Sequence, residues 1–498
     1  MRLSELFGRA EISYPREAEN IEITNIVTDS RRVREGSAFI CINGQRSDGH
    51  RYIGEAIQKG ARVIVAEQVR DEGVGGAATV YVENTRRAAA LLYNAWYGDP
   101  ARNMKLVAVT GTNGKTSVTF MLKRIFERAG YRCGLIGTIG CLCGDRELHS
   151  ENQSDPLANM TTPDPEELYR LLAMMRESGV EYVFMEASSH ALALSKLDAL
   201  CFDVAVFTNF TRDHLDFHGD MEEYFRAKTR LFGICRRAVI NIDDSWAEKL
   251  IASADCKEIY STSTKRSADF FATEIKLSAK FGAGYLFHSF LGMSEMKIPV
   301  AANFFVSNSL QAAAVAAISG IPLDTVRDAL ASIEAIDGRM ERVELGESAD
   351  ITVIIDYAHT PDAIENLLRS IRDVREKGQR IVLLFGCGGE RDRSKRREMA
   401  QIASRLSDMV IVTSDNSRGE SPELIISDIL KGIDKEKEYK VIKKRESAIE
   451  YAIRYARAGD IIVLAGKGHE RYEIDDKGKR PFDEREIVRQ AYGKYREI

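Results

Sequence analysis

The sequence predicts an α/β fold in three domains: a small N-terminal α/β domain, a central domain built on a P-loop ATPase-like parallel sheet, and a C-terminal Rossmann-like domain. The chain has 498 residues, enough for about three domains of ~150 residues each. Short apolar runs alternate with segments of helical periodicity, which is typical of parallel sheets covered by helices. We expect the domains at residues 1–100, 101–336 and 337–498.

The first domain contains short alternating elements. Residues 61–66 (Ala-Arg-Val-Ile-Val-Ala) form an apolar run that predicts a strand, and residues 85–96 have the pattern of a helix. Gly98 and Pro100 follow in the stretch Tyr-Gly-Asp-Pro, which predicts a turn. The turn is therefore expected to end this domain.

The second domain opens with a phosphate-binding loop. Residues 110–117 read Thr-Gly-Thr-Asn-Gly-Lys-Thr-Ser, after an apolar run at 106–109 and before a helical segment at 117–129. A strand, a tight turn and a helix N-terminus aim backbone N–H groups at one point, which suits a phosphate. Lys115 would contact the β- and γ-phosphates, and Thr116 would bind Mg²⁺. The expected ATP loop is Gly111, Thr112, Asn113, Gly114, Lys115, Thr116 and Ser117.

This loop departs from the common P-loop, because Val109 stands where the first glycine belongs. The compact form argues against GTPases and kinases, and favours a narrower group of ATP-dependent ligases.

Two polar segments follow later strands of the same domain. Glu186 ends an apolar strand, where a carboxylate can hold Mg²⁺; the alternative is a solvated loop residue. Residues 208–219 (Thr-Asn-Phe-Thr-Arg-Asp-His-Leu-Asp-Phe-His-Gly) hold two His and two Asp without a zinc pattern, so a hard cation shared with ATP fits best. Asp216 and His218 fit structural hydrogen bonds equally well. Taken alone, Lys228 reads as an ordinary lysine on a helix surface.

The third domain carries four apolar runs, at residues 351–355, 381–385, 409–412 and 461–464, each followed by a polar loop. These loops would place Arg, Asp, Asn and Glu side chains at one edge of a parallel sheet. Carboxylates suit an ammonium group and guanidinium groups suit carboxylates, so the set favours a zwitterionic ligand. Arg391 replaces the third glycine of a dinucleotide fingerprint, which argues against a nicotinamide cofactor.

Composition limits the remaining function classes. The net charge of −5 gives no general attraction to nucleic acid. No run of ~18 apolar residues could span a membrane, and residues 1–5 lack a secretion signal. The eight scattered cysteines read as reduced thiols. We expect a cytoplasmic protein, without nucleic-acid binding or membrane insertion, and a monomer.

Five motifs resemble the Mur ligases of peptidoglycan synthesis, and they span all three domains in order. They read T-G-T-N-G-K-T (110–116), E-A-S-S-H-A-L (186–192), T-N-F-T-R-D-H-L-D-F-H-G (208–219), D-Y-A-H-T-P-D (356–362) and A-G-K-G-H-E (465–470). The resemblance implies an ATP-dependent ligase that activates a carboxylate as an acylphosphate and joins it to an amino acid. It implies ATP and two Mg²⁺ as cofactors, and roles in cell-wall synthesis, cell shape and cell division.

The resemblance also implies roles for matching positions. The UDP-sugar dipeptide would be bound by Thr28, Ser30, Gln45, Arg46, Ser47, Thr161, Thr162, Ser188 and Lys196, the last standing where the family often has Arg. Asn303, Arg339 and Asp356 match positions around ATP. The implied magnesium ligands are Thr116, Glu186, His214 and Lys228, with the lysine carbamylated by CO₂. Lys115, Lys228 and His359 are the expected catalytic residues, with His359 orienting or deprotonating the attacking amine.

The expected substrates are UDP-N-acetylmuramoyl-L-Ala-D-Glu and meso-diaminopimelate, with L-lysine as the alternative amino acid. The family signature for diaminopimelate is Asp-Asn-Pro-Arg, and the chain has Asp-Asn-Ser-Arg at 415–418. Diaminopimelate carries one more carboxylate than lysine, and an arginine can bind it bidentately. The expected contacts are Arg391, Asp415, Asn416, Ser417, Arg418, Gly466 and Glu470.

Two other classes fit part of the sequence. A folylpolyglutamate synthase would share the ATP loop but lack the first domain and the Asp-Asn-x-Arg loop. A catalytically silent ATP-binding paralogue would have no need of Lys115, Glu186, His214 and Lys228 together. Because ATP and the amino acid would bind on different domains, we also expect domain closure.

Overall fold

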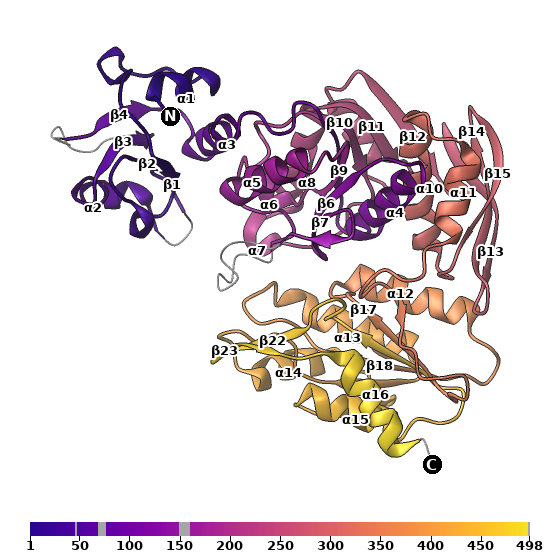
Figure 1. The fold of residues 1–498 in the computed structure, drawn as a ribbon. Helices are drawn as coiled ribbons and strands as arrows, with labels where there is room; N and C mark the ends of the chain where they lie inside the picture. The colour runs from indigo at the N-terminus through magenta and orange to yellow at the C-terminus, as the bar shows by residue number, and fades with distance from the viewer. Residues whose placement is uncertain (45–46, 68–75, 149–159, 497–498) are drawn as a thin grey trace.

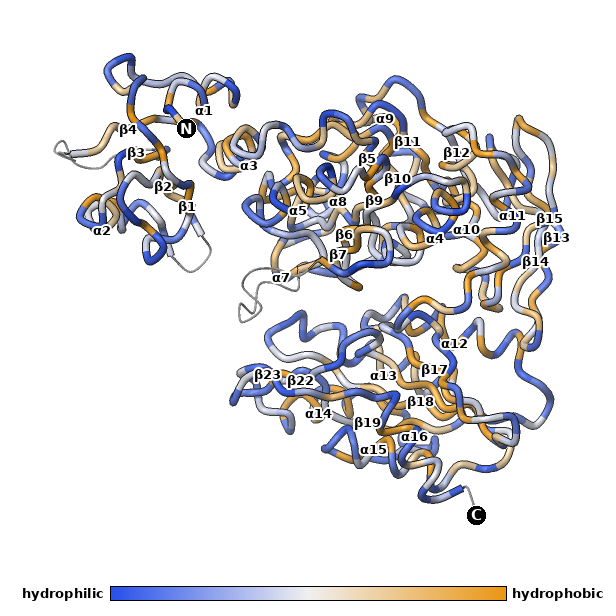
Figure 2. Tube along the Cα trace, viewed as in Figure 1, coloured by the Kyte–Doolittle hydropathy of each residue, from blue (hydrophilic) through white to orange (hydrophobic). Residues whose placement is uncertain are grey.

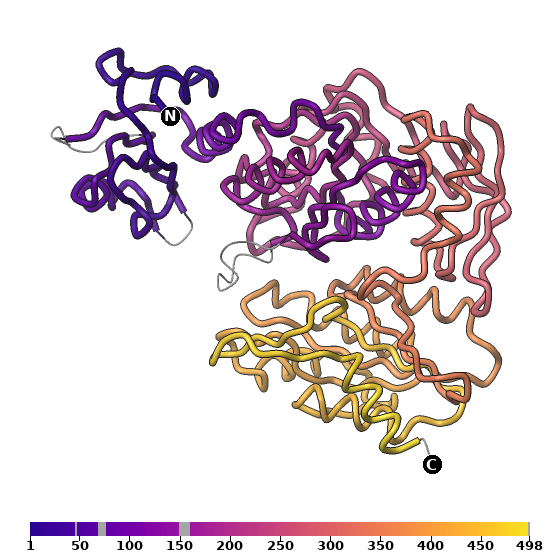
Figure 3. The backbone as a smooth tube through the Cα atoms, in the orientation of Figure 1, coloured from indigo at the N-terminus to yellow at the C-terminus, as the bar shows by residue number. Residues whose placement is uncertain are grey.

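The computed structural model describes residues 1–44, 47–67, 76–148 and 160–496. Its sheets follow one another along the chain, in three parts that Figures 1 and 3 show from indigo to yellow. Each sheet lies inside one of the predicted domains, and the boundaries at 100/101 and 336/337 stay predictions. The predicted fold class is confirmed: a small α/β part, a central sheet rich in parallel strands, and a C-terminal α/β part.

The N-terminal part is a four-stranded parallel sheet in the order β1-β2-β3-β4. The predicted strand at 61–66 and helix at 85–96 are both present with these bounds. The elements are α1 (Leu3–Arg9), β1 (Asn25–Val27), β2 (Ser37–Ile40), α2 (Ile53–Gln58), β3 (Ala61–Ala66), β4 (Ala78–Tyr81) and α3 (Thr85–Trp96).

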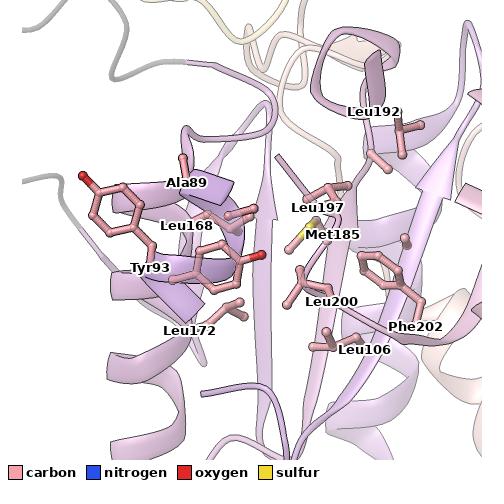
Figure 4. Close-up of a cluster of buried hydrophobic side chains, with 14 of the residues drawn as sticks. Ala89, Tyr93, Leu106, Leu168, Leu172, Met185, Leu192, Leu197, Leu200 and Phe202 are labelled. Carbon is pink, nitrogen blue, oxygen red and sulfur yellow. The ribbon is translucent and has the colours of Figure 1, made fainter. Parts of the chain in front are cut away.

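Helix α3 joins this part to the next one. Ala89 and Tyr93 of α3 lie beside Leu168 and Leu172 of the helix α5 (Pro165–Glu177) in a buried apolar cluster (Figure 4). Burial of a leucine side chain such as those of Leu168 and Leu172 contributes roughly 1.5–3 kcal/mol. The last helix of the first part is therefore anchored on the central part.

The central part holds an eleven-stranded sheet in the order β15-β14-β13-β12-β11-β10-β5-β9-β6-β7-β8. The middle of this sheet, from β6 through β9, β5, β10, β11 and β12 to β13, is parallel. Strands β13–β15 form an antiparallel meander at one edge. Its strands are β5 (Lys105–Thr110), β6 (Cys133–Gly137), β7 (Gly140–Cys143), β8 (Arg146–Glu147), β9 (Tyr182–Glu186), β10 (Phe202–Phe207), β11 (Cys235–Asn241), β12 (Glu258–Ser263), β13 (Phe270–Ser278), β14 (Gly282–Ser289) and β15 (Gly292–Ile298).

The helices of this part cover the sheet, and α10 is buried along most of its length beside α4 (Figure 1). They are α4 (Lys115–Arg128), α5 (Pro165–Glu177), α6 (Ser189–Ala193), α7 (Leu215–His218), α8 (Met221–Thr229), α9 (Ala247–Ser253), α10 (Asn303–Ile318) and α11 (Leu323–Ala331).

The C-terminal part has a six-stranded sheet in the order β16-β17-β21-β18-β19-β20, parallel except for the edge strand β16. Its central strands are hydrophobic, whereas the hairpin β22–β23 is hydrophilic (Figure 2). The elements are β16 (Glu341–Arg342), β17 (Thr352–Asp356), α12 (Pro361–Val374), β18 (Ile381–Phe385), α13 (Ser394–Leu406), β19 (Met409–Val412), α14 (Pro422–Leu430), β20 (Glu438–Val441), α15 (Arg445–Arg454), β21 (Ile461–Ala465), β22 (Tyr472–Asp475), β23 (Gly478–Pro481) and α16 (Glu484–Tyr495).

Within the described residues, no helix is long and apolar enough to cross a membrane.

Candidate active site

The phosphate loop lies between β5 and α4, as its sequence predicts. Gly111 has a φ of 146°, and a Cβ there would fall 1.9 Å from Thr208 Oγ1. Gly114 has a φ of 88°, and a Cβ there would fall 2.5 Å from Asn308 Oδ1. Both positions therefore require glycine. No side chain caps the first turn of α4, so its N–H groups and its dipole face the loop as an anion site requires.

Two lysine side chains meet at one backbone carbonyl of this loop. Lys115 Nζ donates to Gly111 O at 3.0 Å and to Thr112 O at 2.8 Å, and Lys228 Nζ donates to the same Gly111 O at 2.8 Å. Burial is the main cause that lowers the pKa of Lys115, although Glu186 and Asp213 oppose it. The pair places two side-chain amines where a phosphate would sit.

Lys228 is the clearest departure from the sequence interpretation. It is 2% exposed rather than on a helix surface, because α8 turns it inward over the ring of Tyr224 at 4.7 Å. Burial, with the neighbouring Lys115 second, holds the pKa of Lys228 well below its ordinary value. A neutral amine is the form of lysine that reacts with CO₂, so the burial favours the carbamate that the family resemblance implies.

The other expected metal ligands lie around the same loop. Glu186, at the end of β9, is buried and accepts hydrogen bonds from Thr138 N–H at 2.8 Å and Thr138 Oγ1 at 3.0 Å. His214 lies in the left-handed region, with a φ of 54°, and burial holds its pKa well below the ordinary value. Hydroxyl and carboxylate oxygens suit Mg²⁺. No ready-made group of three acidic, His or Cys ligands occurs in the described part of the chain.

The C-terminal part reaches over the phosphate loop. Arg339 Nη2 donates to Thr116 Oγ1 at 3.0 Å, and Asn113 Nδ2 donates to Asp362 Oδ2 at 2.8 Å. The Arg339 guanidinium also lies over the Tyr357 ring, 4.6 Å from its centroid. The expected ATP residue Arg339 is thus brought to the loop. Asp362, the last residue of the motif at 356–362, also contacts the loop, although the sequence predicts no individual role for it.

The other two expected ATP residues have different surroundings. The Asp356 side chain accepts from Met340 N–H at 2.7 Å and Ala358 N–H at 2.8 Å, so it fixes the loop that follows β17. Burial raises the pKa of Asp356. Asn303 is exposed at the first residue of α10.

Asp213 connects the two parts of the site, and sequence reasoning gave it no role of its own. Its carboxylate is buried and lies 3.8 Å from His359 Nε2 and 3.8 Å from Lys395 Nζ, both from the C-terminal part. Burial acts against ionisation of Asp213, but His214 and Lys395 outweigh it and hold the pKa below its ordinary value. The neighbouring Arg212 also contacts the C-terminal part, where its Nη2 donates to Ser394 Oγ.

His359 has a defined tautomer. Its Nδ1 lies 2.8 Å from Tyr357 O, a carbonyl that only accepts, so Nδ1 carries the hydrogen and Nε2 keeps a lone pair. Burial, with Lys395 second, lowers the pKa of His359 to about 4. The side chain is therefore neutral at pH 7 and able to accept a proton.

The residues expected to bind the muramoyl-dipeptide lie close together. Thr162 Oγ1 donates to Glu186 O at 2.7 Å and lies 3.2 Å from Ser188 Oγ, and Thr161 Oγ1 lies 3.1 Å from Thr138 Oγ1. Thr138 thus connects this group to Glu186. Lys196 is buried and ion-paired with Asp164 at 2.8 Å.

The expected uridine loops are only partly described. Ser30 is buried with its Oγ 3.5 Å from Glu55 Oε2, Thr28 is exposed, and Ser47 Oγ donates to Tyr52 OH at 3.1 Å. Gln45 and Arg46 lie outside the described residues.

The expected amino-acid site is assembled from loops that follow β18, β19 and β21. A Cβ on Gly466 would fall 2.6 Å from Asp415 Oδ2, and one on Gly389 would fall 2.0 Å from Ser417 O, so the three loops touch. Asn416 Nδ2 donates to Glu470 Oε2 at 2.8 Å. A cavity of about 710 Å³ begins beside Ser417 and extends along the hairpin β22–β23.

The charges of this site fit a zwitterion. Burial acts to raise the pKa of Asp415, but Lys467 and Arg445 outweigh it and keep this pKa low. The pKa of Glu470 is raised by burial and by Asp415. Arg418 is half-buried, and its Nη1 donates only to the carbonyl oxygens of Gly389 (3.0 Å) and Asn416 (3.2 Å). Arg391 lies exposed beside it, and burial and Arg391 lower the pKa of Arg418.

This geometry, a phosphate loop facing a second domain with a zwitterion site, defines an ATP-dependent ligase. Three family models match the chain: the Mur ligase family, catalytic domain (residues 22–103), the Mur ligase middle domain (109–316), and the Mur ligase, glutamate ligase domain (338–468).

Curated relatives and solved structures agree with these models. The chain is 41% identical to the UDP-N-acetylmuramoyl-L-alanyl-D-glutamate–2,6-diaminopimelate ligase of Syntrophomonas wolfei, over 98% of each chain. It is 42% identical to the ligase of the same name from Caldanaerobacter subterraneus, over 95% of each chain. A solved structure of a ligase of that name superposes with a TM-score of 0.69 at 30% identity, over 99% of both chains. The chain therefore belongs to the Mur ligase family, as its motifs predict.

One structural neighbour bears on an alternative raised by the sequence. A folylpolyglutamate synthase of Mycobacterium tuberculosis shares the fold with a TM-score of 0.62 at 20% identity, but it covers only 77% of this chain.

Proposed function

We propose that the protein adds meso-diaminopimelate to the D-glutamate of UDP-N-acetylmuramoyl-L-Ala-D-Glu, at the expense of ATP, in the cytoplasmic synthesis of peptidoglycan precursors. Relatives at about 40% identity over nearly the full chain carry this activity in their names, which supports the proposal. The proposal also includes that the protein is a monomer.

The choice of diaminopimelate over L-lysine as the substrate rests on the surroundings of the Arg418 side chain. Its guanidinium is half-buried and donates to backbone carbonyls. Among the described residues no carboxylate lies within ion-pair distance of it, and Asp415 and Glu470 act on it only from farther away. The distal carboxylate of diaminopimelate would pair with it, whereas L-lysine would leave it without an anion. Unpaired polar groups of this kind support discrimination of ~10⁴ or more.

The first chemical step is phosphoryl transfer. The γ-carboxylate of D-glutamate attacks the γ-phosphorus of ATP, the bond to the bridging oxygen breaks, and an acylphosphate and ADP result. The loop N–H groups and Lys115 bind the phosphate oxygens and stabilise the charge that develops on them. Arg339 would contact ATP from the opposite side of the cleft.

Thr116, Glu186, His214 and carbamylated Lys228 would hold two Mg²⁺, whose charge would offset that of the phosphates. Carbamylation replaces the Lys228 cation with an anion that has two oxygen atoms. This change would relieve its repulsion with Lys115, which already lowers the pKa of the Lys228 amine.

The second step is attack by the amine of the amino acid on the acylphosphate carbon. Phosphate leaves, and the nitrogen must lose a proton. His359 Nε2 carries the lone pair that can accept it, and Nδ1 is held by Tyr357 O. Asp213 faces Nε2 at 3.8 Å and would stabilise the imidazolium that forms.

Three alternatives make different predictions. An L-lysine ligase would show the same ATP chemistry with the other amino acid. A folylpolyglutamate synthase would not need the first 100 residues, and a silent paralogue would release no phosphate.

The test is phosphate release by the purified protein with ATP, Mg²⁺ and UDP-N-acetylmuramoyl-L-Ala-D-Glu, with meso-diaminopimelate or L-lysine added in parallel. The proposal predicts release that depends on diaminopimelate. Release with lysine alone would retain the ligase and overturn the role of Arg418, and no release with either would overturn the proposed function.

A further inference from the structure

Lys467 is a buried cation in the amino-acid site to which the sequence assigns no role. It follows β21 in the stretch Gly-Lys-Gly-His-Glu and is 0% exposed. Its Nζ donates to Asn416 Oδ1 and to Tyr472 O, both at 2.9 Å. Asp415 Oδ1 lies at 3.7 Å and Glu470 Oε2 at 3.6 Å. The ammonium group therefore sits between the two carboxylates expected to bind the substrate.

The contacts of Lys467 determine how Asn416 is oriented. Asn416 Oδ1 accepts from Lys467 Nζ and also from Ile474 N–H at 2.9 Å. With both donors on the oxygen, the amide nitrogen must point the other way, where it donates to Glu470 Oε2 at 2.8 Å. Loss of Lys467 would remove one of the two donors and one neighbour of Glu470.

Lys467 also sets the charge of the pocket. Arg445 faces Asp415 from α15 but is ion-paired with Glu484 at 2.7 Å, a pair that is fully buried and neutral. Asp415, Glu470 and Lys467 then carry one surplus negative charge among themselves, which matches one ammonium group. The Arg418 guanidinium, which acts on both carboxylates, would pair with a carboxylate of the substrate. Without the lysine, two buried carboxylates would repel each other and favour sharing a proton. The surplus charge would then no longer be fixed.

We propose that Lys467 is a positioning residue for the amino-acid substrate: it holds Asn416 and Glu470 in one orientation and cancels one carboxylate charge, so that the pocket accepts one ammonium group. The inference rests on the proposed function, because it takes this pocket as the amino-acid site. Lys467 does not touch the phosphate loop, so its effect is confined to the amino acid.

The experiment measures steady-state phosphate release for the wild type and for Lys467→Met, Lys467→Gln and Lys467→Arg. The Michaelis constants for meso-diaminopimelate, ATP and the UDP-dipeptide are determined separately. A buried charge-assisted hydrogen bond contributes enough that Lys467→Met should raise the KM for diaminopimelate roughly 10- to 100-fold. The KM values for ATP and the UDP-dipeptide should stay unchanged. Lys467→Arg should recover most of the loss, and Lys467→Gln, which keeps a donor but no charge, should fall between.

Lys440→Met, at an exposed position on β20, is the matched control and should behave like the wild type. An unchanged KM for diaminopimelate, or an equal rise of all three KM values, would overturn the inference. If Lys467→Met does not fold, equal KM values for the Gln and Arg variants would overturn it. A wild type that releases no phosphate with either amino acid would contradict the proposed function itself, and the inference would fall with it.

Discussion

Buried lysines at the two ends of the proposed reaction have opposite surroundings. At the phosphate loop, Lys115 and Lys228 donate to carbonyl oxygens and share Gly111 O. In the amino-acid site, Lys467 lies between Asp415 and Glu470. A buried cation whose nearest partners are neutral carbonyls is suited to an incoming anion, or to conversion into one. A buried cation between carboxylates already has its countercharge and instead orders the groups around it.

Among the substitutions that test this comparison, the largest effect is expected at Lys115. Lys115→Met should lower the rate of phosphate release roughly 10²–10³-fold, because one preorganised donor to the developing charge is lost. The measurement is the rate at saturating substrates.

The matched control is Lys123→Met on the same helix. Lys123 is also buried but pairs with Glu127 at 2.6 Å, away from the loop. The Lys123→Met substitution should lower thermal stability and leave the rate of the folded enzyme unchanged. Equal losses of rate in both variants would contradict the special role of Lys115.

The second largest effect is expected at Lys228, which carbamylation would convert from a cation into an anion. Lys228→Ala should lower the rate roughly 100-fold, the range seen when groups that organise a metal site are removed. Formate, a small carboxylate, should restore part of the rate by filling the space of the carbamate. Arg226→Ala, at an exposed position on the same helix, should neither lower the rate nor make it respond to formate. Rescue that fails at all formate concentrations would count against the carbamate.

A smaller effect, in binding rather than rate, is expected at Arg418. Arg418→Met should raise the KM for diaminopimelate roughly 10- to 100-fold, the value of a charge-assisted hydrogen bond, and reduce the preference over L-lysine. The KM for ATP should not change, and Arg405→Met on α13 is the control. An unaltered preference would show that another group reads the distal carboxylate.

The smallest effect is expected at His359. Its pKa is lowered to about 4, so the neutral form predominates above this pH and the rate should fall as the pH drops through about 4. A base with a pKa of about 4 takes up a proton only weakly at pH 7. His359→Gln, which keeps a hydrogen-bonding amide in place of the ring, should therefore lower the rate only about fivefold at pH 7, the value of one hydrogen bond. The variant should also lose the acid limb of the pH profile. If the rate of the variant still falls as the pH drops through about 4, a group other than His359 causes that fall.

The sequence predicts the strand at residues 61–66, the helix at 85–96 and the phosphate loop, because each depends on neighbouring residues in the chain. It does not predict the burial of Lys228, because Phe-Arg-Ala-Lys has the pattern of an ordinary surface helix and only packing of α8 turns the side chain inward. Asp213 and Lys467 are missed for a related reason. Their roles depend on groups from other parts of the chain, such as Lys395 for one and Asn416 for the other.

The most direct test of the central comparison is ¹³C NMR of the protein in ¹³C-bicarbonate. We expect a carbamate signal in the wild type that is absent from Lys228→Ala and retained in Lys467→Arg. Lys228 donates to a neutral carbonyl, and the lowered pKa of its amine favours the neutral form that reacts with CO₂, whereas Lys467 is held between two carboxylates. A carbamate signal that persists in Lys228→Ala, or no carbamate at all in an active wild type, would contradict it.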